Sequence, residues 1–137
     1  MPMLRRPKVT NVVLCDDIRT ERNNKLIMVG VYTADLLVPK FPANMRLALY
    51  FTVQGAPAGQ HEFEVRIIAT GSNSGISGTV DVANPQDPII VVTPPVPVVF
   101  PKAGKLKVDF KIGDSGWLKV VTKEVSEGAP PGWENLE

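Results

Sequence analysis

A strict alternation of apolar and polar residues is the feature of this sequence that most constrains its fold. It is clearest in residues 105–112, where branched and aromatic side chains alternate with lysine and aspartate. Residues 45–54 and 61–70 repeat the pattern. A period of two places one face of a β-strand on a core and the other in water, as antiparallel sheets do. The sequence therefore predicts an all-β protein.

Two other stretches, residues 9–15 and 26–32, are apolar on both faces, so we expect them to be central strands. Asn23 and Asn24 tolerate the left-handed backbone of a turn and would join the two as a hairpin. Further strands are expected at residues 76–82, 89–92 with a continuation to 100, and 117–123, with a hairpin loop at 71–75. With no helical period and no repeat, this spacing predicts a two-sheet antiparallel β-sandwich of seven to eight strands, immunoglobulin-like or a related Greek key.

The length of 137 residues fits one domain, and thirteen prolines with eleven glycines indicate many short elements joined by turns. We expect the β-sandwich domain to cover residues 1–125. Residues 126–137 form a Gly/Pro-rich acidic tail, in which Trp133 and Leu136 would dock on the lysine face described below, of the same or another copy, or stay disordered.

The overall charge excludes several classes of partner. Fifteen basic and fourteen acidic residues leave a net charge of +1, which argues against nucleic acid or an anionic membrane as the main ligand. No apolar run approaches the roughly 20 residues of a membrane span, and no signal-peptide core is present. The single cysteine excludes an internal disulfide. A reducing cytoplasm is the expected location.

The most unusual polar feature is the pair Asp16 and Asp17 at the end of an apolar strand. They would form the nucleus of a calcium site if acids from other loops joined them. Calcium takes six to eight oxygens, and each loop here offers one or two acids, so a local cap or ion pair is favoured. The candidate partners for such a site are Asp81, Asp87 and Asp114.

Candidate catalytic groups are few. His61 is the only histidine, and no nucleophile-elbow, Walker or G-x-G-x-x-G pattern accompanies it. Cys15 lies in an apolar run beside Asp16, where burial and negative charge would keep its thiol unreactive. We therefore expect a surface histidine, a buried thiol, no bound cofactor and no enzymatic activity.

A lysine face is predicted on the last two strands. Lys105, Lys107 and Lys111 share one side of a strand, and Lys119 and Lys123 share one side of the next. If the register aligned them, they would attract an acidic partner or a phosphate backbone. Lysine is also the usual residue that keeps a sheet face soluble, and the near-neutral total charge favours this second interpretation.

A proline-broken apolar segment at residues 89–101 has two interpretations. Its prolines remove backbone donors, so the segment cannot be one continuous central strand. Either Val96, Val98 and Phe100 enter the core from a kinked edge strand, or they form a partly exposed edge that a neighbouring subunit covers.

The opening block carries a resemblance to a known family. Its residues are Leu14-Cys15-Asp16-Asp17-Ile18-Arg19, followed by Asn24-Lys25-Leu26 and Val29-Gly30-Val31-Tyr32. This block resembles the first hairpin of a family of uncharacterised bacterial β-sandwich proteins. The resemblance implies a bacterial intracellular protein and brings no established activity with it.

Two functions follow as hypotheses. The first is a non-enzymatic structural or interaction protein that acts through self-assembly, such as a homodimer, or through a protein partner. The second is a module that binds a sugar or calcium on a β-sandwich scaffold. The residues that would serve the second are Asp16, Asp17, Tyr50, Asp81, Asp87, Asp114 and Trp117.

Overall fold

The computed structural model describes residues 6–70 and 72–128 and shows an all-β protein, as predicted. These residues form eleven strands and one short 3-10 turn at Arg22–Asn24, without an α-helix. The strands are β1 (Lys8–Cys15), β2 (Asp17–Thr20), β3 (Leu26–Val29), β4 (Leu36–Val38), β5 (Ala43–Gln54), β6 (Gly59–Ala69), β7 (Ser72–Val82), β8 (Ile89–Val92), β9 (Val96–Phe100), β10 (Gly104–Ile112) and β11 (Leu118–Glu127). Among the described residues, no helix has the length and apolar character needed to cross a membrane.

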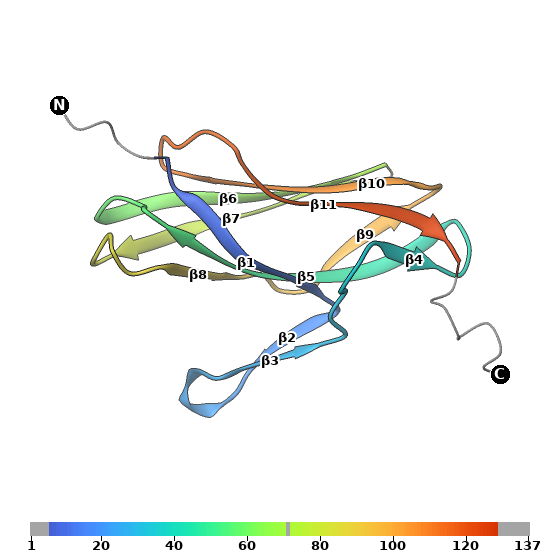
Figure 1. The fold of residues 1–137 in the computed structure, drawn as a ribbon, viewed down its shortest axis with the longest axis horizontal. Coiled ribbons are helices and arrows are strands. Elements are labelled where there is room, and N and C mark those ends of the chain that lie inside the picture. The colour runs from blue at the N-terminus through green and yellow to red at the C-terminus, as the bar shows by residue number, and fades with distance from the viewer. Residues whose placement is uncertain (1–5, 71, 129–137) are drawn as a thin grey trace.

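The strands form three sheets rather than the predicted two (Figure 1). One has five strands in the order β4-β11-β10-β6-β7, and a second has β1, β8 and β9 paired with the long strand β5. The third contains only β2 and β3. Strands β4 and β11 are parallel, so the prediction of a purely antiparallel fold with seven to eight strands was wrong. Short strands such as β2 and β4 carry too few residues to show a period.

One apolar core lies between the two larger sheets. The alternating residues of β10 behave as predicted, because Leu106, Val108 and Phe110 are buried while Lys107 is exposed and Asp109 is half-buried. The Phe110 ring meets Phe51 of β5 edge to face, with centroids 5.2 Å apart and planes at 73°. Such aromatic pairs contribute beyond their buried area, so this contact joins the two sheets at the centre of the core.

The proline-broken segment pairs along β5 in two pieces, as its sequence requires. β8 pairs with residues 50–53 of β5, and β9 pairs with residues 43–47. Between them, Thr93 bonds to Leu49: its amide donates to the carbonyl at 2.9 Å, and its hydroxyl accepts the Leu49 N–H at 2.9 Å. A buried backbone donor needs a partner. The Thr93 hydroxyl supplies it where the following prolines interrupt the ladder.

The predicted first hairpin was wrong in its pairing. β1 pairs with β5, where it forms one edge of that sheet. β3 pairs instead with the short polar strand β2, and the turn between them uses Asn23 and Asn24 at φ of 68° and 61°. The left-handed turn is therefore confirmed, and the strands it joins are β2 and β3. A break at Asp16 separates β2 from β1.

Two boundaries also differ from the predictions. Residues 72–75, expected in a loop, belong to β7, because Ser72 pairs with Ala69. β11 runs to Glu127, two residues into the predicted tail, because Ser126 and Glu127 pair with Leu37 and Val38 of β4. In both places a cross-strand partner extends a strand whose own residues are polar.

Candidate functional site

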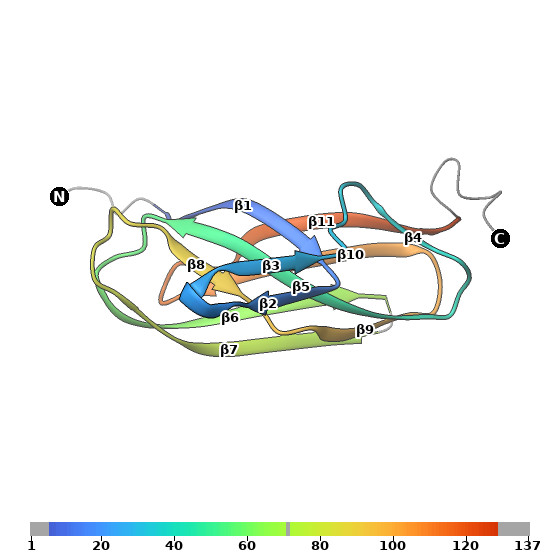
Figure 2. The same ribbon diagram turned by 90° about the horizontal axis from the view of Figure 1, so that it is seen from below.

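A group of exposed apolar side chains lies on and beside a two-stranded arm, defined here as residues 17–29. Figures 1 and 2 show the arm standing off the sheet that contains β1, β5 and β8, on the side away from the five-stranded sheet. Ile27 and Val29 are 41% and 44% exposed, and neighbouring Val31 is 48% exposed. Isolated exposed apolar residues are ordinary, whereas a contiguous group on a projecting element marks an interaction site.

The two faces of the arm differ in exposure. Cross-strand pairs share a face, so Arg19 lies with Ile27 and Asp17 lies with Val29 on the open face. Ile18 and Met28 pair on the opposite face and are half-buried. An isolated two-stranded hairpin is marginal in water. Within the described residues, no other layer covers the open face of the arm, so the arm depends on its half-buried face and on its base for support.

Residues of the opening sequence block hold the base of the arm. The Tyr32 hydroxyl donates to the Asp16 carboxylate at 2.8 Å, and the Tyr32 amide donates to the Leu14 carbonyl at 2.8 Å. The Asp16 amide donates to the Val29 carbonyl at 3.0 Å. Gly30 adopts φ +70°, and a Cβ there would collide with the Asp16 carboxylate. Residues that precede and follow the arm in the sequence thus bond to each other and fix its orientation where it joins the rest of the protein.

We expect the contribution of Tyr32 to stability to disappear at high pH. Burial of the ring raises the pKa of Tyr32, and the hydrogen bond and negative charge of Asp16 raise it further. A folded-state pKa above the unfolded value of about 10 stabilises the fold fully below that pH and loses this effect as pH rises through the folded-state pKa. Tyr32→Phe should therefore be less stable than the wild type at pH 8, by a margin that narrows above about pH 10. Urea denaturation across this range measures it, and a constant margin would contradict the assignment.

The structure separates the predicted calcium ligands. Asp17 pairs with Arg19 at 3.1 Å and Asp16 bonds to Tyr32, so both carboxylates have local partners. Nowhere in residues 6–70 and 72–128 do three histidine, cysteine, aspartate or glutamate side chains gather as metal ligands. Asp81, Asp87 and Asp114 belong to the end of β7 and to two loops, and do not join Asp16 and Asp17.

Cys15 is fully buried beneath the arm base, next to the Ala48 carbonyl. Burial raises the pKa of the Cys15 thiol, and the Asp16 and Asp17 carboxylates raise it further, against an opposing hydrogen bond to the Asp17 backbone. This agrees with the predicted inert thiol.

We expect Cys15 of the folded protein to resist iodoacetamide at pH 8 and to react fully after unfolding, because the thiolate is the reactive form and is disfavoured here. Intact-mass spectrometry of labelled samples with and without urea measures the difference. Rapid labelling of the folded protein would show that the arm base opens.

The lysines of the last hairpin do not form one positive face. A register shift after Val108 places Lys119 opposite Asp109 but Lys123 opposite buried Leu106, so Lys123 lies on the other side of the sheet. Lys105 pairs with Glu124 at 3.7 Å. The face carries both signs of charge, which does not favour a polyanion.

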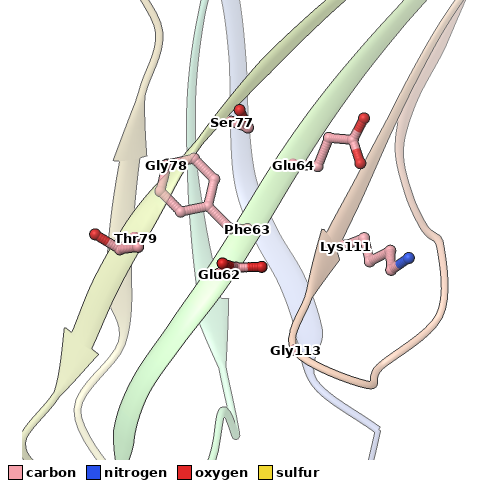
Figure 3. Close-up of a pocket in the computed structure, with 8 residues that line it drawn as sticks. All are labelled: Glu62, Phe63, Glu64, Ser77, Gly78, Thr79, Lys111 and Gly113. Atoms are coloured by element: carbon pink, nitrogen blue, oxygen red, sulfur yellow. The ribbon is translucent and has the colours of Figure 1, made fainter.

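A hollow of about 450 Å³ has the same mixture of charge in its lining. Figure 3 shows the residues that line it. Lys111 of β10 lies opposite Glu64 of β6, and Glu62 is on the same strand. The Phe63 ring lies over Gly78 of β7, where a Cβ would come within 3.0 Å of it. The hollow is lined by glutamate, lysine, serine and threonine side chains around this ring, and offers no concentrated charge.

Trp117, a candidate for sugar stacking, is already used within the protein. The Arg66 guanidinium lies 4.0 Å from the Trp117 ring centroid, and Lys111 Nζ lies 5.6 Å away. Arg66 also donates to Asp109 at 2.9 Å. The ring face is therefore covered by a cation, as in other cation–π contacts. Tyr50, the other aromatic candidate, is half-buried on β5 between β1 and β8.

The remaining predicted interaction residues fall into two groups. Val96, Val98 and Phe100 are 8%, 1% and 0% exposed and belong to the core. The first interpretation of the proline-broken segment is therefore right, and these side chains do not present a surface to a subunit. Trp133 and Leu136 lie outside the described residues.

A cavity of about 600 Å³ opens at the end of the molecule where three loops meet the chain near Arg6. His61 and Asp114 line it together with the rings of Pro57 and Pro85. The His61 Nε2 atom lies 2.7 Å from the Pro57 carbonyl. The Ser115 hydroxyl accepts the Ile112 N–H at 3.1 Å and donates to the Gly116 carbonyl at 2.7 Å. The first contact joins His61 of β6 to the loop before that strand, and the other two hold Ser115 in its own turn.

Sequence reasoning missed the arm. Residues 26–32 were expected to be buried because they are apolar at consecutive positions, a pattern that assigns no face to water. A usable indication was the polar strand Asp17–Thr20, directly before the asparagine turn. A strand of that composition is the natural hairpin partner of β3, and it would have placed Ile27 and Val29 beside charged residues rather than in the core.

Comparison with known proteins identifies a family whose function is not known. A search of curated proteins found no match. A family model described as a family of unknown function, DUF6941, matches residues 11–120, which include the arm, its base and most of the two larger sheets. The chain therefore belongs to the DUF6941 family, whose function is unknown.

Proposed function

We propose that this protein is a non-enzymatic interaction domain that uses the open face of its arm to bind protein, either a second copy or another chain. We place it in a bacterial cytoplasm, in line with its single buried thiol. The shared core of the two larger sheets supports an immunoglobulin-like sandwich or related Greek key as the scaffold.

The observation that carries this proposal is the exposure of Ile27 and Val29 on an element that stands off the body, with exposed Val31 just beyond it. Folding gains little from apolar side chains left in water. Yet a dedicated set of hydrogen bonds at Asp16 and Tyr32 fixes the element that presents them. An arm that is held at its base and apolar on its open face is suited to bind another protein surface.

The non-enzymatic assignment is supported by the hydrogen bonds of His61 and Ser115, which engage both side chains with backbone groups. A nucleophile needs a base within hydrogen-bond reach. The Ser115 hydroxyl is engaged in its own turn, and His61 Nε2 is turned to the Pro57 carbonyl. Both side chains are therefore engaged by backbone groups beside the cavity.

The test replaces the two apolar side chains of the open face with charge. Ile27→Lys with Val29→Lys should abolish the binding of partners retained by the wild-type protein from a lysate of source cells, because desolvating two ammonium groups opposes contact. Val99→Lys is the matched control, since Val99 is 39% exposed on β9, outside the arm. Circular dichroism checks folding of both. Identical partner lists and identical native masses for all three proteins would contradict the proposal.

The cavity at the loop end favours a second function, the binding of a small ligand. Its volume of about 600 Å³ lies in the range of ligand pockets, with a few polar groups around apolar rings. Among the described residues that line it, Asp114 is the only carboxylate, fewer than calcium requires, so a small polar molecule such as a sugar suits it better. Thermal-shift measurements with monosaccharides and with calcium chloride test this function. No change in Tm would rule against it.

A further inference from the structure

We propose that the partner of the arm is the arm of a second copy of this chain, joined edge to edge through β3 in antiparallel pairing about a two-fold axis. The result is a four-stranded sheet in the order β2-β3-β3-β2, shared by two molecules. This inference rests on the proposed function and names the occupant of the same surface.

The backbone of β3 has one paired edge and one open edge. The Glu21 amide donates to the Lys25 carbonyl at 2.7 Å, and Arg19 lies opposite Ile27. Because hydrogen-bonding directions alternate along a strand, the backbone groups of Lys25 and Ile27 face β2. Those of Leu26 and Met28 face away, where no strand joins this sheet within the described residues. An open edge of this kind is a template for another strand.

The length of extended backbone sets the register. Lys25 is extended, at φ −76° and ψ 146°, and Gly30 ends the strand at φ +70°. Five residues, 25–29, are therefore available, and their centre is Ile27. Centring the axis there places Ile27 opposite Ile27 of the second copy. It also pairs Leu26 of each copy with Met28 of the other, one pair on either side of the axis. These two Leu26–Met28 pairs use the amide and carbonyl groups that face the open edge.

The open face of the resulting sheet is complementary to itself. Its central row reads Arg19, Ile27, Ile27 and Arg19, with the two arginines three strand spacings apart, about 14 Å. This separation exceeds the Debye length of roughly 8 Å at physiological ionic strength, and each Arg19 is already paired with Asp17. The flanking rows set Val29 of one copy beside Lys25 of the other, so no like charges are opposed.

The arrangement has the anatomy of an interface, with apolar residues at the centre and charges at the rim. A strand of another sequence would match the open edge but would not reproduce the central isoleucine pair. Five paired residues bury less than the roughly 800 Å² per partner of a standard interface. The dimer is therefore expected to form and dissociate with protein concentration.

Cysteine cross-linking of the purified full chain tests the register. Ile27 and its counterpart form a non-hydrogen-bonded pair, with Cα atoms about 4.5 Å apart, inside the range that a disulfide spans. Ile27→Cys should therefore oxidise rapidly to a covalent dimer on a non-reducing gel. Val29→Cys is the matched control, because Val29 is equally exposed, at 44% against 41%, yet lies about 13 Å from its counterpart along the strand. Native Cys15 is buried and stays out of the reaction.

Sedimentation velocity of the uncrosslinked proteins gives an independent measurement. The wild type should shift from monomer to dimer as concentration rises, Val99→Lys should behave alike, and Ile27→Lys should stay monomeric. Equal cross-linking of the two cysteine variants, or a wild-type monomer at every concentration, would overturn the second copy as partner. If the wild type is monomeric while Ile27→Lys still loses a lysate partner, the proposed function stands alone. If Ile27→Lys changes neither mass nor partners, both proposals fail.

Discussion

Replacing Phe51 by alanine is expected to lower the free energy of unfolding by about 3–5 kcal/mol, the cost of a large buried aromatic side chain. Phe51 is completely buried, and its ring meets Phe110 edge to face across the two larger sheets. The substitution therefore removes apolar contacts and leaves a cavity between layers that cannot close without moving a sheet. Urea denaturation followed by circular dichroism measures the change.

Val99→Ala provides the control, because this side chain is 39% exposed and its loss should change stability by about 0.5 kcal/mol or less. A small effect of Phe51→Ala, similar to that of the control, would mean that the contact between the two sheets contributes little. It would contradict the single core described above.

Gly30→Ala is expected to destabilise the protein by about 2 kcal/mol or more and to release the arm. The left-handed backbone at φ +70° costs an alanine about 1–2 kcal/mol. In addition, the new Cβ would displace the Asp16 carboxylate that accepts the Tyr32 hydroxyl. Hydrogen exchange should show faster exchange of the Tyr32 amide, which donates to Leu14, while the core strands stay protected.

Gly75→Ala is the matched control for this change. Gly75 lies in β7, its φ is not left-handed, and a Cβ there would meet nothing closer than 3.9 Å. It should leave both stability and the exchange of Tyr32 unchanged. If Gly30→Ala behaved like Gly75→Ala, the base of the arm would have to be looser than its hydrogen bonds indicate.

The parts of the fold that could be predicted are those where one strand face meets the core. In β10, Leu106, Val108 and Phe110 alternate with charged residues, and the structure buries the apolar side chains and leaves the charged ones exposed or half-buried. The breaks could also be predicted, because Pro94 and Pro95 cannot continue a ladder and Asn23 and Asn24 accept a left-handed turn. In each case the constraint is local, within a few residues.

The candidate site could not be predicted in this way, because it depends on contacts between strands and not on neighbouring residues. Consecutive apolar residues in β3 are compatible with a buried central strand, and only the pairing with β2 places Ile27 and Val29 in water. The lysine face failed on a single register shift after Val108, which no pattern within one strand reveals. Charge compensation by Glu64 and Glu124 comes from other strands in the same way.

The sequence by itself therefore determined the all-β class, the core-facing residues of β5, β6 and β10, and the buried position of Cys15. Each follows from the chemistry of neighbouring residues and the geometry of an extended chain. The tertiary structure alone decided which strands pair, that β4 joins β11 in parallel, and that residues 17–29 leave the body as an arm. Strand pairing is a long-range choice among many partners of similar local preference. Its outcome depends on how both sheet faces are covered, which only the packed molecule specifies.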